Sequence, residues 1–235
     1  MNGTSIPALR RRVILTDGLP VAAYTLCAIA FVLLALTTHQ ANALPGDISI
    51  ARHLQSIHLP VFEGIMQTLT RMGFFVPSSI ILGLFALAFW IARRPVEVIF
   101  IFLTATGDLM NQIVKIVVER PRPLSDVVIV FEELNEYSFP SAHVTHYVVF
   151  YGFLFFLFWT LLPGSWLRAL ALVVTASLIL LSGPSRVYLG AHWPSDVLGA
   201  YLLGGLWLVI LIEAYTTCKQ RWELRKQRER TDTGG

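Results

Sequence analysis

Six long apolar runs, separated by shorter polar segments, follow one another along the chain. A bilayer core about 30 Å thick needs about 20 residues of helix, and each run has close to that length. The runs are Leu19–Thr38, Gly73–Ala92, Val98–Val118, Val144–Leu162, Trp166–Gly183 and Val197–Tyr215. The pattern predicts an all-α fold, a polytopic membrane helical bundle with six transmembrane helices, in a single domain over residues 1–235.

The segment between the first and second runs, residues 40–72, has a different periodicity. Its apolar residues recur at helical spacing, which predicts one or two amphipathic helices that lie in the membrane interface or pack over the bundle. The residues that carry this spacing are Val61, Phe62, Ile65, Met66 and Leu69. The tripeptide Ala41-Asn42-Ala43 resembles a signal-peptidase site, but the first run is longer than the apolar part of a signal peptide, so we expect a retained span.

The composition agrees with a membrane protein. Hydrophobic residues make up 55% of the 235 residues and charged residues 14%, against about 25% charged in an average soluble domain. This excludes a disordered chain and argues against a soluble enzyme. The 2 cysteines exclude a disulfide scaffold and a four-thiolate zinc site. We therefore expect the lipid bilayer as a partner, and no nucleic acid.

Basic residues are unevenly distributed between the predicted loops. If there are six spans, one side carries Arg10, Arg11, Arg12, Arg93, Arg94, Arg168, Lys219, Arg221, Arg225, Lys226, Arg228 and Arg230. An excess of Lys and Arg marks the cytoplasmic side of a membrane protein. The distribution predicts a cytoplasmic N-terminus (residues 1–18), a basic cytoplasmic tail (residues 217–235) and an outer segment 40–72.

Three polar clusters fall on the predicted outer side, each at the end of a span. They lie at residues 115–123, 139–143 and 185–196. Ionisable groups near hydrocarbon are costly, so such a group is a candidate functional site. The clusters supply three cations, two histidines and a carboxylate, namely Lys115, Arg122, Arg186, His143, His192 and Asp196.

This set of side chains suits phosphoryl transfer. Three cations match a dianionic phosphate, and a helix that begins after Pro140 offers Ser141 and free backbone amides to its oxygens. Imidazole acts as a nucleophile or general acid near neutral pH. Asp196 is four residues from His192 and can orient its ring, while His143 remains as the acid. The residues alone do not decide which histidine attacks. Two histidines and an aspartate are also zinc ligands, although the cations would repel the ion.

Other polar residues near these clusters have more than one interpretation. Asp108 and Asn111 share a helix face with Lys115 and either position it or are satisfied inside the bundle, the second being favoured. His146, one turn after the second cluster, either lines the pocket or is structural. Two groups are interpreted as surface features, the interfacial pair Glu119–Arg120 and the loop acids Glu132, Glu133 and Glu136.

The three clusters resemble the signature motifs of the type-2 phosphatidic acid phosphatase family, which includes lipid phosphate phosphatases and undecaprenyl-diphosphate phosphatases. The matching segments, in order and spacing, are Lys115-x6-Arg122-Pro123, Pro140-Ser141-Ala142-His143 and Ser185-Arg186-x5-His192-x3-Asp196. The resemblance implies that His192 is the nucleophile, that Asp196 orients it and that His143 protonates the leaving group. It implies phosphate binding by Lys115, Arg122, Ser141, Ala142 and Arg186. The family usually has glycine at position 142, so an added methyl group is expected beside the phosphate.

We therefore expect a lipid phosphate phosphatase of a bacterial cell membrane, acting at the outer leaflet through a phosphohistidine and without a metal or other cofactor. Its candidate substrates are undecaprenyl diphosphate, phosphatidic acid and phosphatidylglycerol phosphate. Alternatives are a lipid phosphotransferase that uses the same residues and, from another class, a lipid transporter or flippase. The sequence leaves the oligomeric state open.

Overall fold

The computed structural model describes residues 18–131 and 134–232, in which every regular element is a helix. The prediction of a cytoplasmic N-terminus therefore falls almost entirely outside the described residues, as do Glu132 and Glu133. In chain order the elements are α1 (Gly18–Thr38), α2 (Asp47–Gln55), α3 (Pro60–Met72), α4 (Phe75–Ile91), α5 (Pro95–Leu103), α6 (Thr106–Val118), α7 (Ala142–His146), the π-helical turn η3 (Tyr147–Tyr151), α8 (Gly152–Leu161), α9 (Trp166–Tyr188) and α10 (Pro194–Asp232).

The expected membrane bundle is confirmed, with five helical segments long and apolar enough to cross a bilayer and a sixth if a bent pair counts as one span. The bent pair is α3 and α4, which meet at 73°. Gly73 ends α3, and Phe74 has extended backbone, so the chain changes direction between the two helices. The second predicted span is thus α4 alone, 17 residues long, with the amphipathic α3 set at an angle before it.

Two predicted spans are locally interrupted. The third breaks at Thr104, whose hydroxyl donates to the carbonyl of Ile101 at 2.6 Å and so competes with regular helix geometry. The fourth contains η3 between α7 and α8, and such π-helical turns are common near functional sites. Both interruptions separate a polar part of the span from an apolar part.

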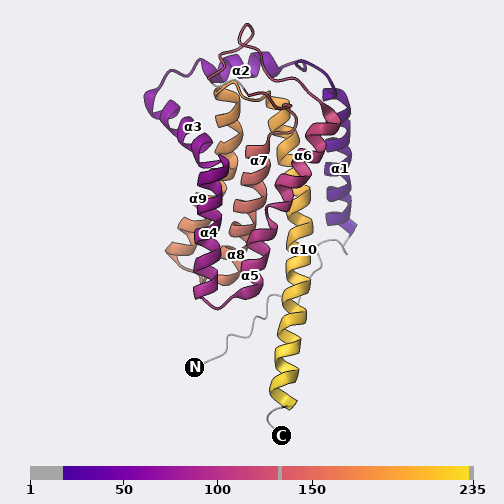
Figure 1. Ribbon diagram of the computed structural model, residues 1–235, viewed down its shortest axis with the longest axis vertical. Helices are drawn as coiled ribbons and strands as arrows, with labels where there is room; N and C mark the ends of the chain where they lie inside the picture. The colour runs from indigo at the N-terminus through magenta and orange to yellow at the C-terminus, as the bar shows by residue number, and fades with distance from the viewer. Residues whose placement is uncertain (1–17, 132–133, 233–235) are drawn as a thin grey trace.

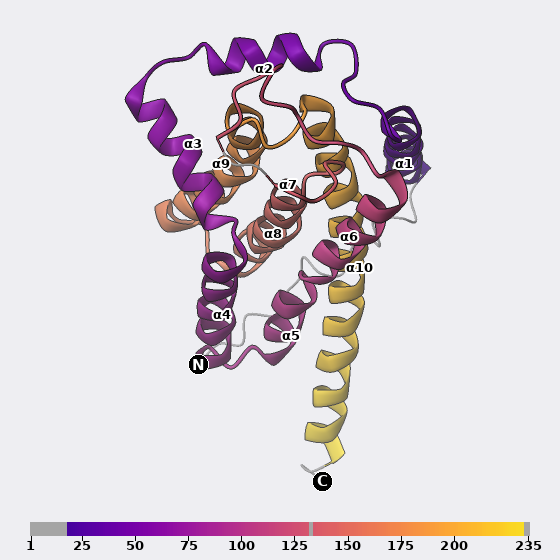
Figure 2. The same ribbon diagram turned by 45° about the horizontal axis from the view of Figure 1, so that its top comes forward.

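The helices pack side by side, and α2 lies across one end of the bundle (Figure 1). α3 packs against α9, and the turned view shows it descending beside that helix from the α2 end (Figure 2). We call the end covered by α2 the capped end. At the opposite end, α10 continues well beyond its neighbours (Figure 1). The sixth predicted span and most of the predicted tail are therefore one helix of 39 residues.

Candidate active site

The three polar clusters meet at the capped end of the bundle. Because the helices alternate in direction, this is where α6 and α9 end and where α7 and α10 begin. α6 supplies Lys115, α7 supplies His143, and the last turn of α9 supplies Arg186. His192 lies in the connection between α9 and α10, and Asp196 in the first turn of α10. The sequence motifs thus mark helix ends that converge.

His192 lies at the centre of this group, with 2% of its surface exposed. Its Nε2 is 3.2 Å from Nη1 of Arg122. A guanidinium can only donate, so Nε2 accepts and the ring proton lies on Nδ1. That Nδ1 is 3.4 Å from the Ser138 hydroxyl and 3.6 Å from Oδ2 of Asp196. The ring therefore turns an unprotonated nitrogen toward the cations.

The environment of His192 keeps the ring neutral. Burial lowers its pKa well below the ordinary 6.5, and the charges of Arg122, Arg186 and Lys115 lower the pKa further. All three cations predicted from the sequence thus act on this one ring. A neutral imidazole retains the lone pair that a nucleophile requires.

Asp196 is completely buried, and both of its carboxylate oxygens are hydrogen-bonded. Oδ1 accepts from Nη1 of Arg120 at 2.5 Å, and Oδ2 accepts from the Ser138 hydroxyl at 2.5 Å and the backbone N–H of Trp193 at 2.8 Å. These contacts fix the carboxylate beside the Nδ1 edge of His192. The Ser138 hydroxyl thus donates to Asp196 and lies 3.4 Å from Nδ1 of His192. No sequence motif had indicated a role for this serine.

Arg120 corrects an interpretation made from the sequence. It is not an interfacial partner of Glu119 but a fully buried residue that bridges Asp196 and Asp47. Glu119 ends α6 in the left-handed region, with φ 52°, and its carboxylate accepts from the Gln40 amide. The following residue therefore points inward. Its Nη2 donates to Oδ2 of Asp47 at 2.7 Å, which ties the site to the start of α2.

Asp47 is in turn held by the first turn of α10. The backbone N–H and the hydroxyl of Ser195 donate to its two oxygens at 2.9 and 2.7 Å, and the hydroxyl also accepts from Arg120 at 2.7 Å. These contacts form one closed network, which we call the capped-end network. Its members are Asp47, Arg120, Ser195 and Asp196. A lone Asp at a helix start gives no sequence signal for such a partner.

The three predicted phosphate-binding cations already have some contacts. Arg122 donates through Nε to the carbonyl of Glu136 and through Nη1 to that of Ala191, both at 2.7 Å. Nζ of Lys115 is 3.1 Å from Oε2 of Glu136. This hydrogen bond and the charge of Lys115 lower the pKa of the Glu136 carboxyl. Glu136 is thus the exposed loop residue that was expected, and in addition it forms an ion pair with Lys115.

Arg186 is positioned by α3. Its Nη1 donates to the hydroxyl of Thr70 at 3.2 Å, and that hydroxyl is 2.7 Å from the hydroxyl of Ser185. Ser185 also donates to the carbonyl of Met66 at 2.9 Å. The bent helix pair therefore takes part in the site, a contribution that the sequence did not indicate.

The second motif contributes polar atoms that lack partners. The hydroxyl oxygen of Ser141 and Nε2 of His143 are both buried and make no hydrogen bond to the described residues. Buried polar groups without partners are rare, and they indicate a place for a ligand. Ala142 is the first residue of α7 and has ordinary helical backbone, so its methyl group adds no backbone strain.

The polar face of α6 has a structural role. Nδ2 of Asn111 donates to the hydroxyl of Thr145 at 2.9 Å and to the carbonyl of Pro140 at 3.3 Å. Asp108 lies 3.1 Å from Nδ1 of His146. Asn111 thus fixes the start of α7, whereas the Asp108–His146 pair links the two helices beside the site.

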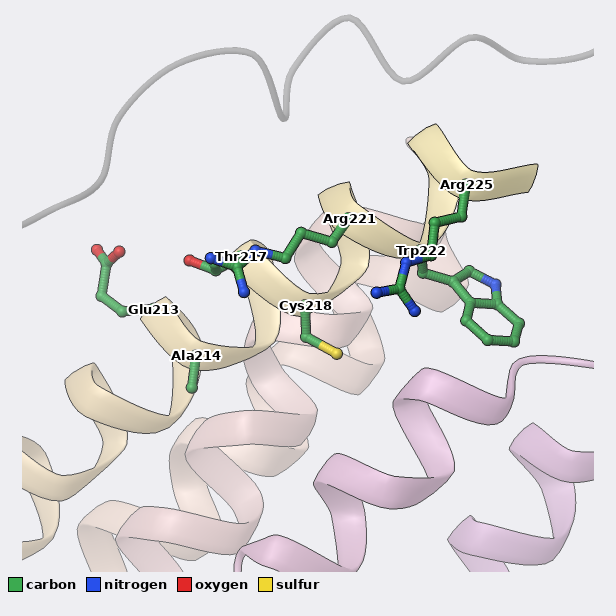
Figure 3. Close-up of a pocket in the computed structure, with 7 residues that line it drawn as sticks. All are labelled: Glu213, Ala214, Thr217, Cys218, Arg221, Trp222 and Arg225. Atoms are coloured by element: carbon green, nitrogen blue, oxygen red, sulfur yellow. The ribbon is translucent and has the colours of Figure 1, made fainter. Parts of the chain in front are cut away.

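No three His, Cys, Asp or Glu side chains of residues 18–131 and 134–232 gather as a metal site would require. A hollow at the opposite end of the bundle contains none of the motif residues. Its described lining comes from α10 alone, namely Glu213, Ala214, Thr217, Cys218, Arg221, Trp222 and Arg225 (Figure 3). The arrangement at the capped end, in contrast, combines a neutral imidazole with cations and unpartnered donors. It is suited to phosphoryl transfer.

Comparisons with known proteins agree with this chemistry. The family model of the PAP2 superfamily matches residues 96–220, just over half of the chain. Phosphatidylglycerophosphatase B of Bacillus subtilis is 29% identical over 189 residues, which cover 79% of this chain and 90% of that protein. An undecaprenyl-diphosphatase of Sulfolobus acidocaldarius is 25% identical over 171 residues, covering 70% and 76%.

A solved structure supports the same assignment. The crystal structure of a transmembrane PAP2-type phosphatidylglycerolphosphate phosphatase from Bacillus subtilis matches with a TM-score of 0.66 and 26% identity. The match covers 80% of this chain and 93% of that one. The resemblance seen in the sequence motifs is therefore confirmed. The chain belongs to the PAP2 superfamily and is a membrane lipid phosphatase of that type.

Proposed function

We propose that this phosphatase hydrolyses the terminal phosphate of a lipid phosphate or diphosphate through a phosphohistidine on His192, without a metal ion. One observation carries the proposal. His192 is a neutral imidazole whose Nε2 accepts from Arg122, and the charges of three cations act on it. The buried and unpartnered atoms of Ser141 and His143 support it, because a bound phosphoryl group would satisfy both.

The chemistry proceeds in two steps. Nε2 of His192 attacks phosphorus, the bond from phosphorus to the leaving oxygen breaks, and His143 gives a proton to that oxygen. Asp196 stabilises the imidazolium that forms, as the acid of a catalytic triad does. Water then attacks the phosphohistidine, His143 accepts its proton, and inorganic phosphate leaves. The phosphoryl oxygens are held throughout by Lys115, Arg122, Arg186, Ser141 and the Ala142 amide.

The density of positive charge supports a reaction without a metal. In many phosphoryl-transfer enzymes, metal ions neutralise the charge that develops on the phosphate. Here Lys115, Arg122 and Arg186 supply that charge, and all three act on His192. A divalent cation at the same place would be repelled by them.

The substrate is an amphiphile with a terminal phosphate. The named relatives act on a phosphatidylglycerophosphate and on undecaprenyl diphosphate, and both compounds, together with phosphatidic acid, remain candidates for this chain. The proposed location is the inner membrane of a bacterium, with the capped end at the outer leaflet. The basic residues support this orientation. Arg93 and Arg94 lie between α4 and α5 at the other end, Arg168 lies in the first turn of α9, and α10 carries its basic part there.

Phosphate release by the purified protein tests the mechanism. With chelator present, we expect turnover on a panel of the three lipid phosphates and none by His192→Ala. The matched control is His58→Ala, because His58 is exposed between α2 and α3. Brief exposure to substrate labelled in its terminal phosphate should leave acid-labile label on the protein, absent from His192→Ala. Loss of turnover with chelator would contradict the metal-free reaction, and transfer of label to an added lipid alcohol would reveal a phosphotransferase.

The orientation has a separate test. Single cysteines are placed at Ser125 and Ser165, both exposed, after Cys27 and Cys218 are replaced. We expect an impermeant thiol reagent to label the first from outside intact cells and to miss the second. The reverse pattern would place the site in the cytoplasm.

A further inference from the structure

A small pocket adjoins the phosphate site on the side of the bent helix pair. Its volume is about 250 Å³, below the usual range for a whole drug-sized ligand, so it suits part of a headgroup rather than a lipid tail. α3 and Phe74, which immediately precedes α4, contribute one wall, the end of α9 and the residues that follow it another, and Phe131 a third. Its lining includes Gln67, Thr70, Arg71, Phe74, Arg186 and Ala191.

The pocket shares walls with the phosphate site. Arg186 is one of the cations around His192, and the Ala191 carbonyl accepts from Arg122 at 2.7 Å. Thr70, next to Arg71, accepts from Arg186 at 3.2 Å. A group bound in the pocket would therefore be a direct neighbour of the phosphoryl group.

The pocket lies on the leaving-group side of that phosphoryl group. In a phosphoryl transfer the attacking and leaving atoms lie roughly in line, so the leaving group lies opposite His192, toward the acid His143. The ring of His143 packs edge-on against that of Phe74, with ring centroids 5.3 Å apart. Gly73 lies so close to the His143 ring that a Cβ at this position would clash with it. Phe74 also lines the pocket. The leaving group thus extends toward α3 and Arg71.

The charges favour an anion in this pocket. Arg71 is exposed in the last turn of α3 and has no carboxylate within ion-pair distance among the described residues. Gln67 is a neutral neighbour whose amide donates to Glu63. A second opening beside the site, about 430 Å³, is lined by Arg120, Arg122 and Glu136. Its two arginines already have partners within the protein, since Arg120 pairs with two carboxylates and Arg122 donates to two backbone carbonyls. Arg71 is therefore a fourth cation, placed where the leaving group lies.

We propose that Arg71 binds a second phosphate, carried by the leaving group, and so makes the enzyme selective for lipids with two phosphates over those with one. Such lipids are a lipid diphosphate, or a lipid whose terminal phosphate is separated by glycerol from a phosphodiester. With a diphosphate, the bond between the terminal phosphorus and the bridging oxygen breaks. The lipid monophosphate then departs beside Arg71. This inference rests on the proposed function and names the substrate class of the same site.

The test uses two matched substrate pairs in detergent micelles. The first is farnesyl diphosphate against farnesyl monophosphate, and the second is phosphatidylglycerophosphate against phosphatidic acid. We expect Arg71→Ala to lower kcat/KM at least tenfold for the two-phosphate member of one or both pairs, with little change for its partner. Arg71→Lys should retain part of the selectivity, since it keeps a charge but loses the bidentate fork.

Arg52→Ala is the control, because this exposed arginine of α2 binds the Val127 carbonyl outside the pocket. It should leave both substrate ratios unchanged. The pair that responds shows whether the second phosphate is adjacent or separated by glycerol. Equal loss on all four substrates, or no loss on any, would overturn the role of Arg71. If the wild-type protein releases no phosphate from any of them, the proposed function itself is wrong.

Discussion

Two groups of buried charge lie at opposite ends of this protein. At the capped end, Arg120 is enclosed between Asp47 and Asp196. At the other end, Glu97 of α5 is fully buried and accepts from Nζ of Lys219 in α10 at 2.9 Å. Both groups join elements that are distant in the sequence, by ion pairs removed from water.

The two groups differ in how completely they are satisfied. In the capped-end network every carboxylate oxygen has a partner. At the other end, Oε1 of Glu97 accepts from Lys219 and Tyr215, whereas Oε2 has no partner among the described residues. A closed network fixes a carboxylate in one orientation, and a half-closed one only holds two helices together. We therefore expect the first group to support the proposed reaction and the second to support the fold.

Arg120→Met should give the largest effect and would test the first half of this comparison. It leaves Asp47 and Asp196 without their buried cation, which typically costs about 3–5 kcal/mol. We expect kcat to fall at least about 100-fold with little change in KM, because Arg120 orients Asp196 and does not touch phosphate. Steady-state kinetics on a lipid phosphate provide the measurement. A variant that loses stability but keeps its kcat would reduce Arg120 to a structural role. Arg120→Lys should recover part of kcat.

Lys219→Met should separate stability from activity at the other end. Removing the cation leaves the buried Glu97 uncompensated, but the Lys219 side chain is 11% exposed, so the cost should be smaller, about 2–3 kcal/mol. Unfolding in detergent should show this loss, while kcat of the folded fraction stays within about twofold. A fall in kcat as large as that of Arg120→Met would mean that the two ends are coupled.

The capped end also shows which parts of the site can be predicted from the sequence. Lys115, His143 and His192 were predicted to lie together because their motifs stand at helix ends that a membrane bundle must bring to one side. The roles of Arg120 and Asp47 could not be predicted, since they are 73 residues apart and meet only when α2 folds across the bundle. Periodicity indicates which face of a helix is polar, but it carries no information about that docking.

The interior of the fold shows the same limit. Six apolar runs were recognised from length alone, whereas the 73° bend before α4 and the break at Thr104 depend on local hydrogen bonds and on Gly73. A glutamate near the end of an apolar run, such as Glu97, is ordinarily expected at the membrane interface. Its burial depends on α10 continuing to Lys219, which a hydropathy pattern does not predict.

The titration of His192 sharpens the comparison at the capped end. Since burial and three cations lower its pKa well below 6.5, the ring should stay neutral as the pH falls through 6.5 and gain its proton only at lower pH. Nitrogen NMR of labelled histidine, assigned with His192→Gln, should show a neutral ring with its proton on Nδ1. Removing one cation by Arg122→Gln should raise this pKa. A titration midpoint at or above 6.5 in the wild-type protein would contradict the proposed electrostatics.

Arg94→Gln should give the smallest effect and tests whether burial, rather than the number of ion pairs, decides the strength of the second group. Arg94 lies 3.6 Å from Glu97, but its side chain is 39% exposed, so water screens the pair and the side chain loses entropy in forming it. We expect the free energy of unfolding to change by less than about 0.5 kcal/mol, with kcat unaffected. Chemical unfolding beside Lys219→Met makes the comparison within one carboxylate. If both variants lose equal stability, Glu97 is stabilised by the sum of the charges of Arg94 and Lys219, and the exposure of these two partners does not matter. If only Lys219→Met is destabilised, the buried contact between α5 and α10 carries the stability of that end.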